Sequence, residues 1–328
     1  MNIFCYCSPY KYYLENLTPL LEASVKRGHN INISFSDQHS SDIENISEIS
    51  VTKSGSFVKK FFNGKYRPDV VILVQPWWYV DKKIANFCKK NNISLYVIDH
   101  AAPMSRFVEK NGKKSHLYRS NLGSSKAFFC YGRETANIMK KVGCKSKLVL
   151  SGSPRVEEQY NIALKNIKNN RITIYDTSHR MESRLAVNKS IKSALKLSKH
   201  YNLDILIKEH PRSSKLVRSL LRKAVVDKNE IRSASESMFC IFTMPSSSML
   251  LPALLGKKII AGYSDHFSDD IKRYYKRYKD EIPNKNTYGN RLNEKIKYNN
   301  FIKDNLELPT GGSAEYIIKW IEKNENRF

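Results

Sequence analysis

The sequence predicts an α/β protein of two Rossmann-like domains, whose parallel sheets face a cleft. Three observations favour this fold. Short apolar runs alternate with segments of helical periodicity, as in parallel sheets whose faces are covered by helices. The chain has 328 residues, and domains of about 100–200 residues make two of them the expectation. Polar residues follow several of the apolar runs, at the carboxyl ends of strands where such sheets bind ligands.

The alternation is clearest between Leu203 and Asp265. Apolar runs that predict strands occupy Leu203–Lys208, Met238–Met244 and Ile259–Gly262. The second run is followed by a serine-rich turn and by the helical segment Met249–Leu255, which ends at a glycine. Two polar turns follow strands of this stretch: Lys208-Glu209-His210-Pro211-Arg212 after the first run and Pro245-Ser246-Ser247-Ser248 after the second. Because ligands bind at the carboxyl ends of parallel strands, one cleft is expected to contain both turns.

The first half of the chain shows the same pattern. The segment between residues 36 and 67 is polar, and the first turn has no Gly-x-Gly-x-x-Gly, the fingerprint of dinucleotide binding. We expect an acceptor-side domain at 1–155. Strands are expected at Asn2–Cys7, Asn30–Phe35, Val70–Val74, Ser94–Ile98, Ala127–Tyr131 and Lys147–Leu150, with helices at Tyr13–Arg27, Asp81–Asn91 and Glu134–Val142.

The second half, 156–328, is expected to bind the nucleotide donor and to include the C-terminal helices. The polar stretch 265–308 has no clear assignment beyond helix. Besides the strands given above, we expect a strand at Arg171–Tyr175 and helices at Val156–Ile167, Glu182–His200, Asp269–Tyr278, Arg291–Lys303 and Ala314–Glu322.

The formal net charge is +25, and the basic residues are spread along the whole chain. Such a surface attracts anionic lipid, phosphate-rich substrates or nucleic acid. No nucleic-acid motif accompanies the lysines, so an anionic membrane surface and anionic substrates are favoured. No apolar run reaches the length of a membrane span, and the N-terminus lacks the basic leader of a signal peptide. Six scattered cysteines without zinc-site spacing indicate reduced core thiols in a cytosolic protein.

Candidate site residues follow the expected strands. His100 comes after Ser94–Ile98 and is a candidate general base, although a histidine satisfied by local hydrogen bonds is the more common case. The serines could bind phosphate at a helix N-terminus or only cap the helix. The other candidates in the second half are Asp176, Arg180, Lys208, His210, Arg212, Ser246, Ser247 and Ser248.

Acceptor-side candidates come from the first half. Trp77 and Trp78 follow a buried strand, where they could stack on a sugar or base or pack between domains. Arg106 begins a basic, turn-rich segment expected beside the cleft, and Arg155 closes the Gly-Ser-Pro-Arg turn at the domain boundary. Arg155 could contact a phosphate or the acceptor.

Taken in order, these motifs resemble the CDP-glycerol glycerophosphotransferases of teichoic acid and capsule synthesis. The resemblance covers roughly residues 1–265 and implies a GT-B fold and a peripheral enzyme at the inner face of the cell membrane. The motifs that carry it are His100-Ala101-Ala102-Pro103, Gly152-Ser153-Pro154-Arg155, Lys208-Glu209-His210-Pro211, Ser246-Ser247-Ser248 and Ala253-Leu254-Leu255-Gly256-Lys257.

The resemblance implies transfer of glycerol- or ribitol-phosphate from a CDP-activated donor to a cell-surface glycopolymer or its lipid-linked precursor. His100 would be the base, with His210, Arg212 and the serines on the phosphates. The histidine-proline turn and the serine run also resemble bacterial sialyltransferases and capsule Kdo transferases. A CMP-sugar donor therefore stays open, with Asp176 as the base.

Other classes also stay open. A degenerate GT-B protein could bind nucleotide or glycan without turnover, and a nucleic-acid binder would rest on charge alone. No Asp-x-Asp triplet occurs, and the leading interpretation needs neither a protein-bound metal nor a cofactor.

Overall fold

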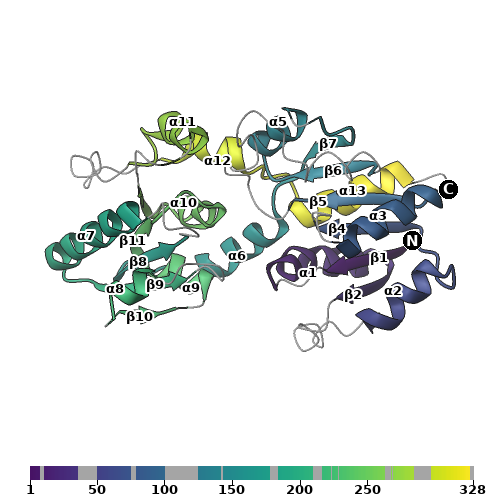
Figure 1. The fold of residues 1–328 in the computed structure, drawn as a ribbon, viewed down its shortest axis with the longest axis horizontal. Helices are drawn as coiled ribbons and strands as arrows, with labels where there is room; N and C mark the ends of the chain where they lie inside the picture. The colour runs from purple at the N-terminus through teal and green to yellow at the C-terminus, as the bar shows by residue number, and fades with distance from the viewer. Residues whose placement is uncertain are drawn as a thin grey trace. The chain divides into compact units, whose positions relative to one another are not determined.

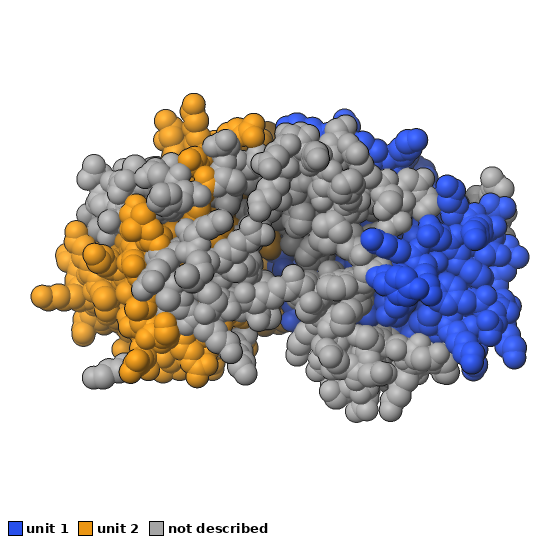
Figure 2. Space-filling model, in the orientation of Figure 1, with its two compact units in different colours: residues 1–102, 108–157, 305–328 blue, residues 103–107, 158–304 orange. Residues whose placement is uncertain are grey.

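The structure is a computed structural model and describes residues 1–7, 11–35, 50–74, 79–99, 125–141, 143–177, 184–209, 216–222, 224–227, 229–262, 267, 269–283 and 297–325. The chain forms two compact units (Figure 2). Unit 1 consists of Met1–Ala102, Val108–Glu157 and Asn305–Phe328, and unit 2 of Pro103–Phe107 and Glu158–Asp304. Each unit is described by itself.

Unit 1 contains a seven-stranded sheet in the order β3-β2-β1-β4-β5-β6-β7. All its strand pairs are parallel. The strands are β1 Asn2–Cys7, β2 Asn30–Phe35, β3 Ser50–Lys53, β4 Val70–Val74, β5 Ser94–Ile98, β6 Ala127–Cys130 and β7 Lys147–Leu150, and the helices are α1 Lys11–Lys26, α2 Ser54–Phe62, α3 Tyr79–Lys90, α5 Arg133–Lys141, the start of α6 Pro154–Leu164, and α13 Ser313–Glu325.

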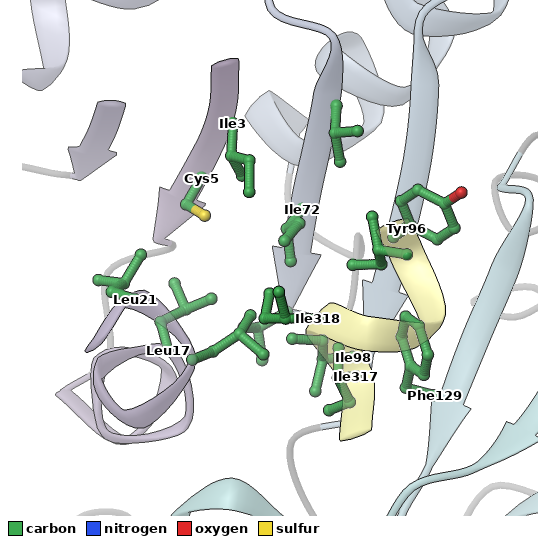
Figure 3. Packing of buried hydrophobic residues seen from close by; sticks show 14 of the residues in the cluster. Ile3, Cys5, Leu17, Leu21, Ile72, Tyr96, Ile98, Phe129, Ile317 and Ile318 are labelled. Carbon is green, nitrogen blue, oxygen red and sulfur yellow. The ribbon is translucent and has the colours of Figure 1, made fainter. Parts of the chain in front are cut away.

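The C-terminal helix α13 belongs to unit 1, although the sequence analysis grouped it with the second half. Its apolar face, Ile317, Ile318 and Ile321, packs into the same core as α1 and the first strands (Figure 3). Its polar side is tied to unit 1 as well, because Glu322 accepts two hydrogen bonds from Arg27, at 2.9 and 2.6 Å. Apolar burial and these charges together explain why the chain end returns to the first sheet.

Unit 2 contains a five-stranded parallel sheet in the order β10-β9-β8-β11-β12 (Figure 1). The middle of each longer strand is mostly apolar, as expected for a parallel sheet covered on both faces. The strands are β8 Arg171–Asp176, β9 Asp204–Glu209, β10 Val225–Val226, β11 Ser237–Phe242 and β12 Lys258–Ala261, and the helical segments are the remainder of α6, α7 Arg184–Tyr201, α8 Leu216–Leu220, α9 Glu230–Ser235, the 3₁₀ turn η4 Ser247–Met249, α10 Leu250–Leu254, α11 Asp269–Tyr278 and α12 Asn299–Asn305.

The expected α/β fold is confirmed, and most strands lie within a residue or two of their predicted bounds. Two short strands, β3 and β10, were not predicted. The first is a four-residue edge strand with three polar residues, and the second has only two residues, so neither produces an apolar run. The helix expected at Arg291–Lys303 is α12, which begins only at Asn299; residues 291–296 lie outside the described part.

All six cysteines are free, and five of them are buried. Burial raises the pKa of the Cys5 thiol to about 12, which keeps it protonated and unreactive. These side chains therefore act as small apolar core residues. Across the described residues, no helix is both long and apolar enough to cross a membrane.

Candidate functional site

The sheet of unit 2 reverses its strand order between β8 and β11. From β8 the chain moves outward to β9 and β10, whereas from β11 it moves to β12 on the other side. The connections that leave the carboxyl ends of β8 and β11 therefore diverge. Parallel α/β sheets bind ligands at this topological switch point. Two of the predicted features, Asp176 and the serine run, lie directly at it.

Two buried threonines join these strand ends. Thr177 Oγ1 accepts a hydrogen bond from Met244 N at 3.1 Å and donates one to Met244 O at 2.9 Å. The hydroxyl of Thr243 accepts a hydrogen bond from Thr177 N at 3.0 Å. Because both partners of each bond are buried, the two connections start from a fixed geometry. This pair was not identified from the sequence, where neither threonine stands in a recognisable motif.

The serine run forms a capped turn. Ser246 has extended backbone angles (φ −148°, ψ 153°), and its Oγ accepts a hydrogen bond from Ser248 N at 3.3 Å at the start of η4. The turn continues directly into α10, and Gly256 (φ +65°) follows the helix end, as predicted. The side chains of Ser246, Ser247 and Ser248 are half-buried. The capping function is therefore seen directly, and Ser247 and Ser248 place two further hydroxyls at the switch point.

Asp176 lies beside a second carboxylate. It is fully buried at the end of β8, and its register partner on β9 is Glu209. Paired residues on adjacent parallel strands project from the same face of a sheet, so both carboxyl groups lie on one face. Glu209 Oε1 is buried and has no hydrogen-bond partner among the described residues. An unsatisfied buried acceptor is costly, which makes this oxygen a place where a donor group of a ligand would be stabilising.

Glu209 was not among the site residues predicted from the sequence, although its neighbours Lys208 and His210 were. The signal that identifies it is register with Asp176, which no local pattern contains. Lys208 lies one residue earlier in the same strand and therefore projects from the opposite face. The structure thus separates Lys208 from the two carboxylates.

Unit 1 has its own polar cluster at the carboxyl ends of its strands. Asp99, which follows β5, accepts a hydrogen bond from Thr135 Oγ1 at 3.0 Å. Tyr131, which follows β6, donates one to Asn16 Oδ1 on α1 at 2.5 Å. Burial raises the pKa of the Tyr131 hydroxyl to about 12, so it remains a neutral donor. Both groups hold helices of unit 1 onto its sheet.

Arg155, a predicted phosphate or acceptor contact, also lies in this cluster. Its side chain is largely buried at the start of α6, with Nη1 3.4 Å from Glu15 Oε2. The Arg155 guanidinium therefore has an anionic neighbour within unit 1, whereas the serine run lies in unit 2. The structure does not bring these two predicted features together within one unit.

The glycine of the Gly-Ser-Pro-Arg turn has a packing role. Gly152 has φ +72°, and a Cβ there would lie 2.2 Å from Glu307 O and 2.4 Å from Ser313 Oγ. Nearby, Glu157 Oε2 accepts a hydrogen bond from Ser313 N at 2.6 Å. Only glycine allows the C-terminal segment to approach this closely. The turn therefore attaches the chain end to unit 1.

The remaining predicted residues lie outside the described part of the chain. They include both candidate histidines and the two tryptophans. These residues are His100, His210, Arg212, Arg180, Trp77, Trp78 and Arg106. Within the described part, no cluster of His, Cys, Asp or Glu is arranged to hold a metal ion.

Comparisons with known proteins are informative only at the level of fold. No protein-family model matches the sequence, and no curated protein matches it either. Solved structures do match. The UDP-GlcNAc 2-epimerase from Neisseria meningitidis, bound to UDP-GlcNAc, is 15% identical with a TM-score of 0.66, over 99% of this chain and 100% of that one.

Two further solved structures are similar over nearly the whole chain. The wall teichoic acid polymerase TagF, soaked with CDPG, is 15% identical with a TM-score of 0.65, over 98% of this chain and 88% of that one. MurG from Acinetobacter baumannii is 10% identical with a TM-score of 0.54, over 98% and 99% of the two chains. The chain therefore has the GT-B fold, in which two Rossmann-like domains each contribute a parallel sheet.

Proposed function

We propose that the chain is a transferase that moves glycerol- or ribitol-phosphate from a CDP-activated donor to a cell-surface glycopolymer or its lipid-linked precursor. The observation that carries this proposal is the switch point of unit 2. There, the joined strand ends Thr177–Met244 present the half-buried serine run beside Asp176. The fold shared with a teichoic acid polymerase soaked with CDPG supports the same choice of substrate.

The phosphates of the donor are proposed to lie against the serine run. Hydroxyl groups at the start of a helical turn donate hydrogen bonds to phosphate oxygens, and the turn is held in place by the Ser246 cap. His210, Arg212, Arg180 and Lys208 are proposed to add positive charge there. Arg155, Trp77, Trp78 and Arg106 are proposed to contact the acceptor from unit 1.

In the proposed reaction, an acceptor hydroxyl attacks the β-phosphate of the donor and CMP leaves. His100, which directly follows the buried Asp99 at the end of β5, is proposed to take the proton from this hydroxyl. Positioned acid–base catalysis contributes about 10²–10⁴ in rate. Loss of the imidazole should therefore lower turnover by that order.

A second candidate is a glycosyltransferase that uses a CMP-sugar of the sialic acid or Kdo type. The observation that favours it is the buried Asp176 paired in register with Glu209. A buried carboxylate at the carboxyl end of a strand is suitably placed to act as a general base. In this reaction Asp176 would take the acceptor proton, and His210 would stabilise the departing CMP.

One experiment separates these proposals: CMP release from CDP-glycerol and from CMP-sialic acid, with wild-type protein, His100→Ala and Asp176→Asn. A loss of about 10²–10⁴ in His100→Ala on CDP-glycerol supports polyol-phosphate transfer. His200→Ala and Asp204→Asn are matched controls, because both side chains are exposed in unit 2. If turnover falls only in Asp176→Asn, and on the CMP-sugar, the sugar-transfer proposal holds. No turnover on either donor, with nucleotide binding retained, would indicate a binding module.

A further inference from the structure

Helix α7 presents an exposed stripe without a single acidic residue. The 18-residue segment Arg184–Tyr201 contains no Asp or Glu. Its exposed or half-exposed positions recur every three or four residues, which places them on one face of the helix. These positions are Leu185, Lys189, Lys192, Lys196 and Lys199, with Leu195 beside them.

The stripe continues onto α8 and the edge of the sheet. Helices α7 and α8 lie next to each other (Figure 1). An open groove of about 850 Å³ runs between the end of α7, α8 and the amino-terminal ends of the strands. Leu195, Leu220 and Val225 line this groove and are 49, 48 and 65% exposed. The groove is therefore at the opposite end of the sheet from the candidate site.

Arg171 lines the groove and is paired with Glu236 at 3.0 Å, whereas the described cations on α7 and α8 form no internal salt bridge with a described carboxylate. Among the described residues, no carboxylate forms a salt bridge with Lys192, Lys196 or Lys199, and Arg218 and Arg222 at the end of α8 are exposed as well. By contrast, Arg27 and Lys126 in unit 1 are paired with glutamates of α13. Of the described residues that line the groove, only Asp204 is acidic.

We propose that this face, consisting of the exposed side of α7, α8 and the adjoining groove, binds an anionic phospholipid surface. The lysines and arginines would contact headgroup phosphates, while Leu195, Leu220 and Val225 enter the boundary between headgroups and acyl chains. Cationic residues surrounding exposed leucines are the pattern of interfacial amphipathic helices. The inference rests on this surface alone and is independent of the proposed reaction.

Two other partners fit the face less well. A second copy of the chain, related by a two-fold axis, would place the same lysines against each other, and like charges repel. A nucleic acid would match the charge, but it gains stability from stacking on aromatic side chains, and the exposed apolar residues here are aliphatic.

The test is co-sedimentation of the full chain with vesicles of phosphatidylcholine alone or of equimolar phosphatidylcholine and phosphatidylglycerol. Binding is expected only to the anionic vesicles. Lys192→Glu, Lys196→Glu and Lys199→Glu together should weaken it at least about 100-fold. The matched control reverses three exposed lysines of unit 1, Lys89, Lys90 and Lys140, with the same change in net charge. This control should retain most of the binding.

A second variant tests the apolar contact. Leu195→Ser with Leu220→Ser should weaken binding to the anionic vesicles without changing its salt dependence, and unchanged thermal unfolding would show that both variants fold. Unaltered binding of the leucine variant would contradict the lipid contact. Equal losses in the lysine variant and its control would show that net charge alone drives binding and would overturn the proposal. So would tighter binding to transfer RNA than to the anionic vesicles.

Discussion

The two sheets place polar side chains at their carboxyl ends in different ways. In unit 1, Asp99 is bonded to Thr135, Tyr131 to Asn16, and Arg155 lies beside Glu15. These contacts link strand ends to helices of the same unit. In unit 2, the strand ends are instead bonded to each other through Thr177.

This difference indicates separate roles for the carboxyl edges of the two sheets. The polar groups of unit 1 are largely used in holding its own helices and the returning chain end. In unit 2, the threonine bonds fix the backbone, while the serine hydroxyls are half-buried and Glu209 Oε1 has no described partner. A rigid edge that keeps polar groups available is what a ligand site requires. The described residues therefore favour unit 2 as the donor side.

The largest stability effect is expected for Gly152→Ala in unit 1. Left-handed backbone costs a non-glycine residue about 1–2 kcal/mol, and overpacking against Glu307 O adds about 1–3 kcal/mol. The free energy of unfolding should fall by about 2–5 kcal/mol in denaturant titration. Gly143→Ala is the control, because Gly143 also has positive φ (+81°) but no atom within 4 Å. Equal losses in both variants would contradict a special role for the Gly152 contact.

A smaller effect is expected for Thr177→Val in unit 2. The substitution leaves Met244 N and O without their buried partner, at about 1–3 kcal/mol. It should also weaken nucleotide binding about tenfold, because the strand ends at the switch point loosen. Thr173→Val is the matched control. Thr173 is also buried and hydrogen-bonded on β8, but toward the other end of the strand. The same nucleotide affinity in both variants would separate Thr177 from the site.

The smallest effect concerns the charges that hold α13. Hydrogen bonds from Arg27 and then from His29 lower the pKa of the Glu322 carboxyl, and burial lowers the pKa of His29. Both folded-state shifts disfavour protonation, so this contribution is fully present above the ordinary pKa values of the two groups. This stabilising contribution is lost as the pH falls through the lowered pKa values of the folded state. A partly exposed cluster of this kind contributes about 1 kcal/mol or less.

The measurement is the unfolding free energy of wild type and Glu322→Gln from neutral pH down to about pH 2–3, below the ordinary glutamate pKa of about 4.3. The difference between them should shrink as the pH falls. A difference that stays constant would show that the Glu322 charge makes no contribution.

Most of the fold could be predicted from the sequence, because buried parallel strands such as Val70–Val74 are continuous apolar runs. The attachment of α13 to unit 1 could not be predicted, because it depends on contacts such as Glu322–Arg27 between residues 295 positions apart in the sequence. The site divides in the same way. The serine cap is a local pattern and was predicted, whereas the Thr177–Met244 bonds and the Asp176–Glu209 pairing depend on register between strands and could not be.

The most direct test of the proposed donor is thermal unfolding of the wild-type protein with CMP, CDP, UMP, UDP, GDP and ADP. A ligand at a hundred times its dissociation constant adds about 2.7 kcal/mol of stability, which is a clear rise in Tm. We expect CDP and CMP to raise Tm, the other nucleotides to have little effect, and Thr177→Val to reduce the shift. A rise with UDP or GDP instead would contradict the cytidine donor while leaving the nucleotide site in unit 2. No rise with any of them would contradict the account as a whole.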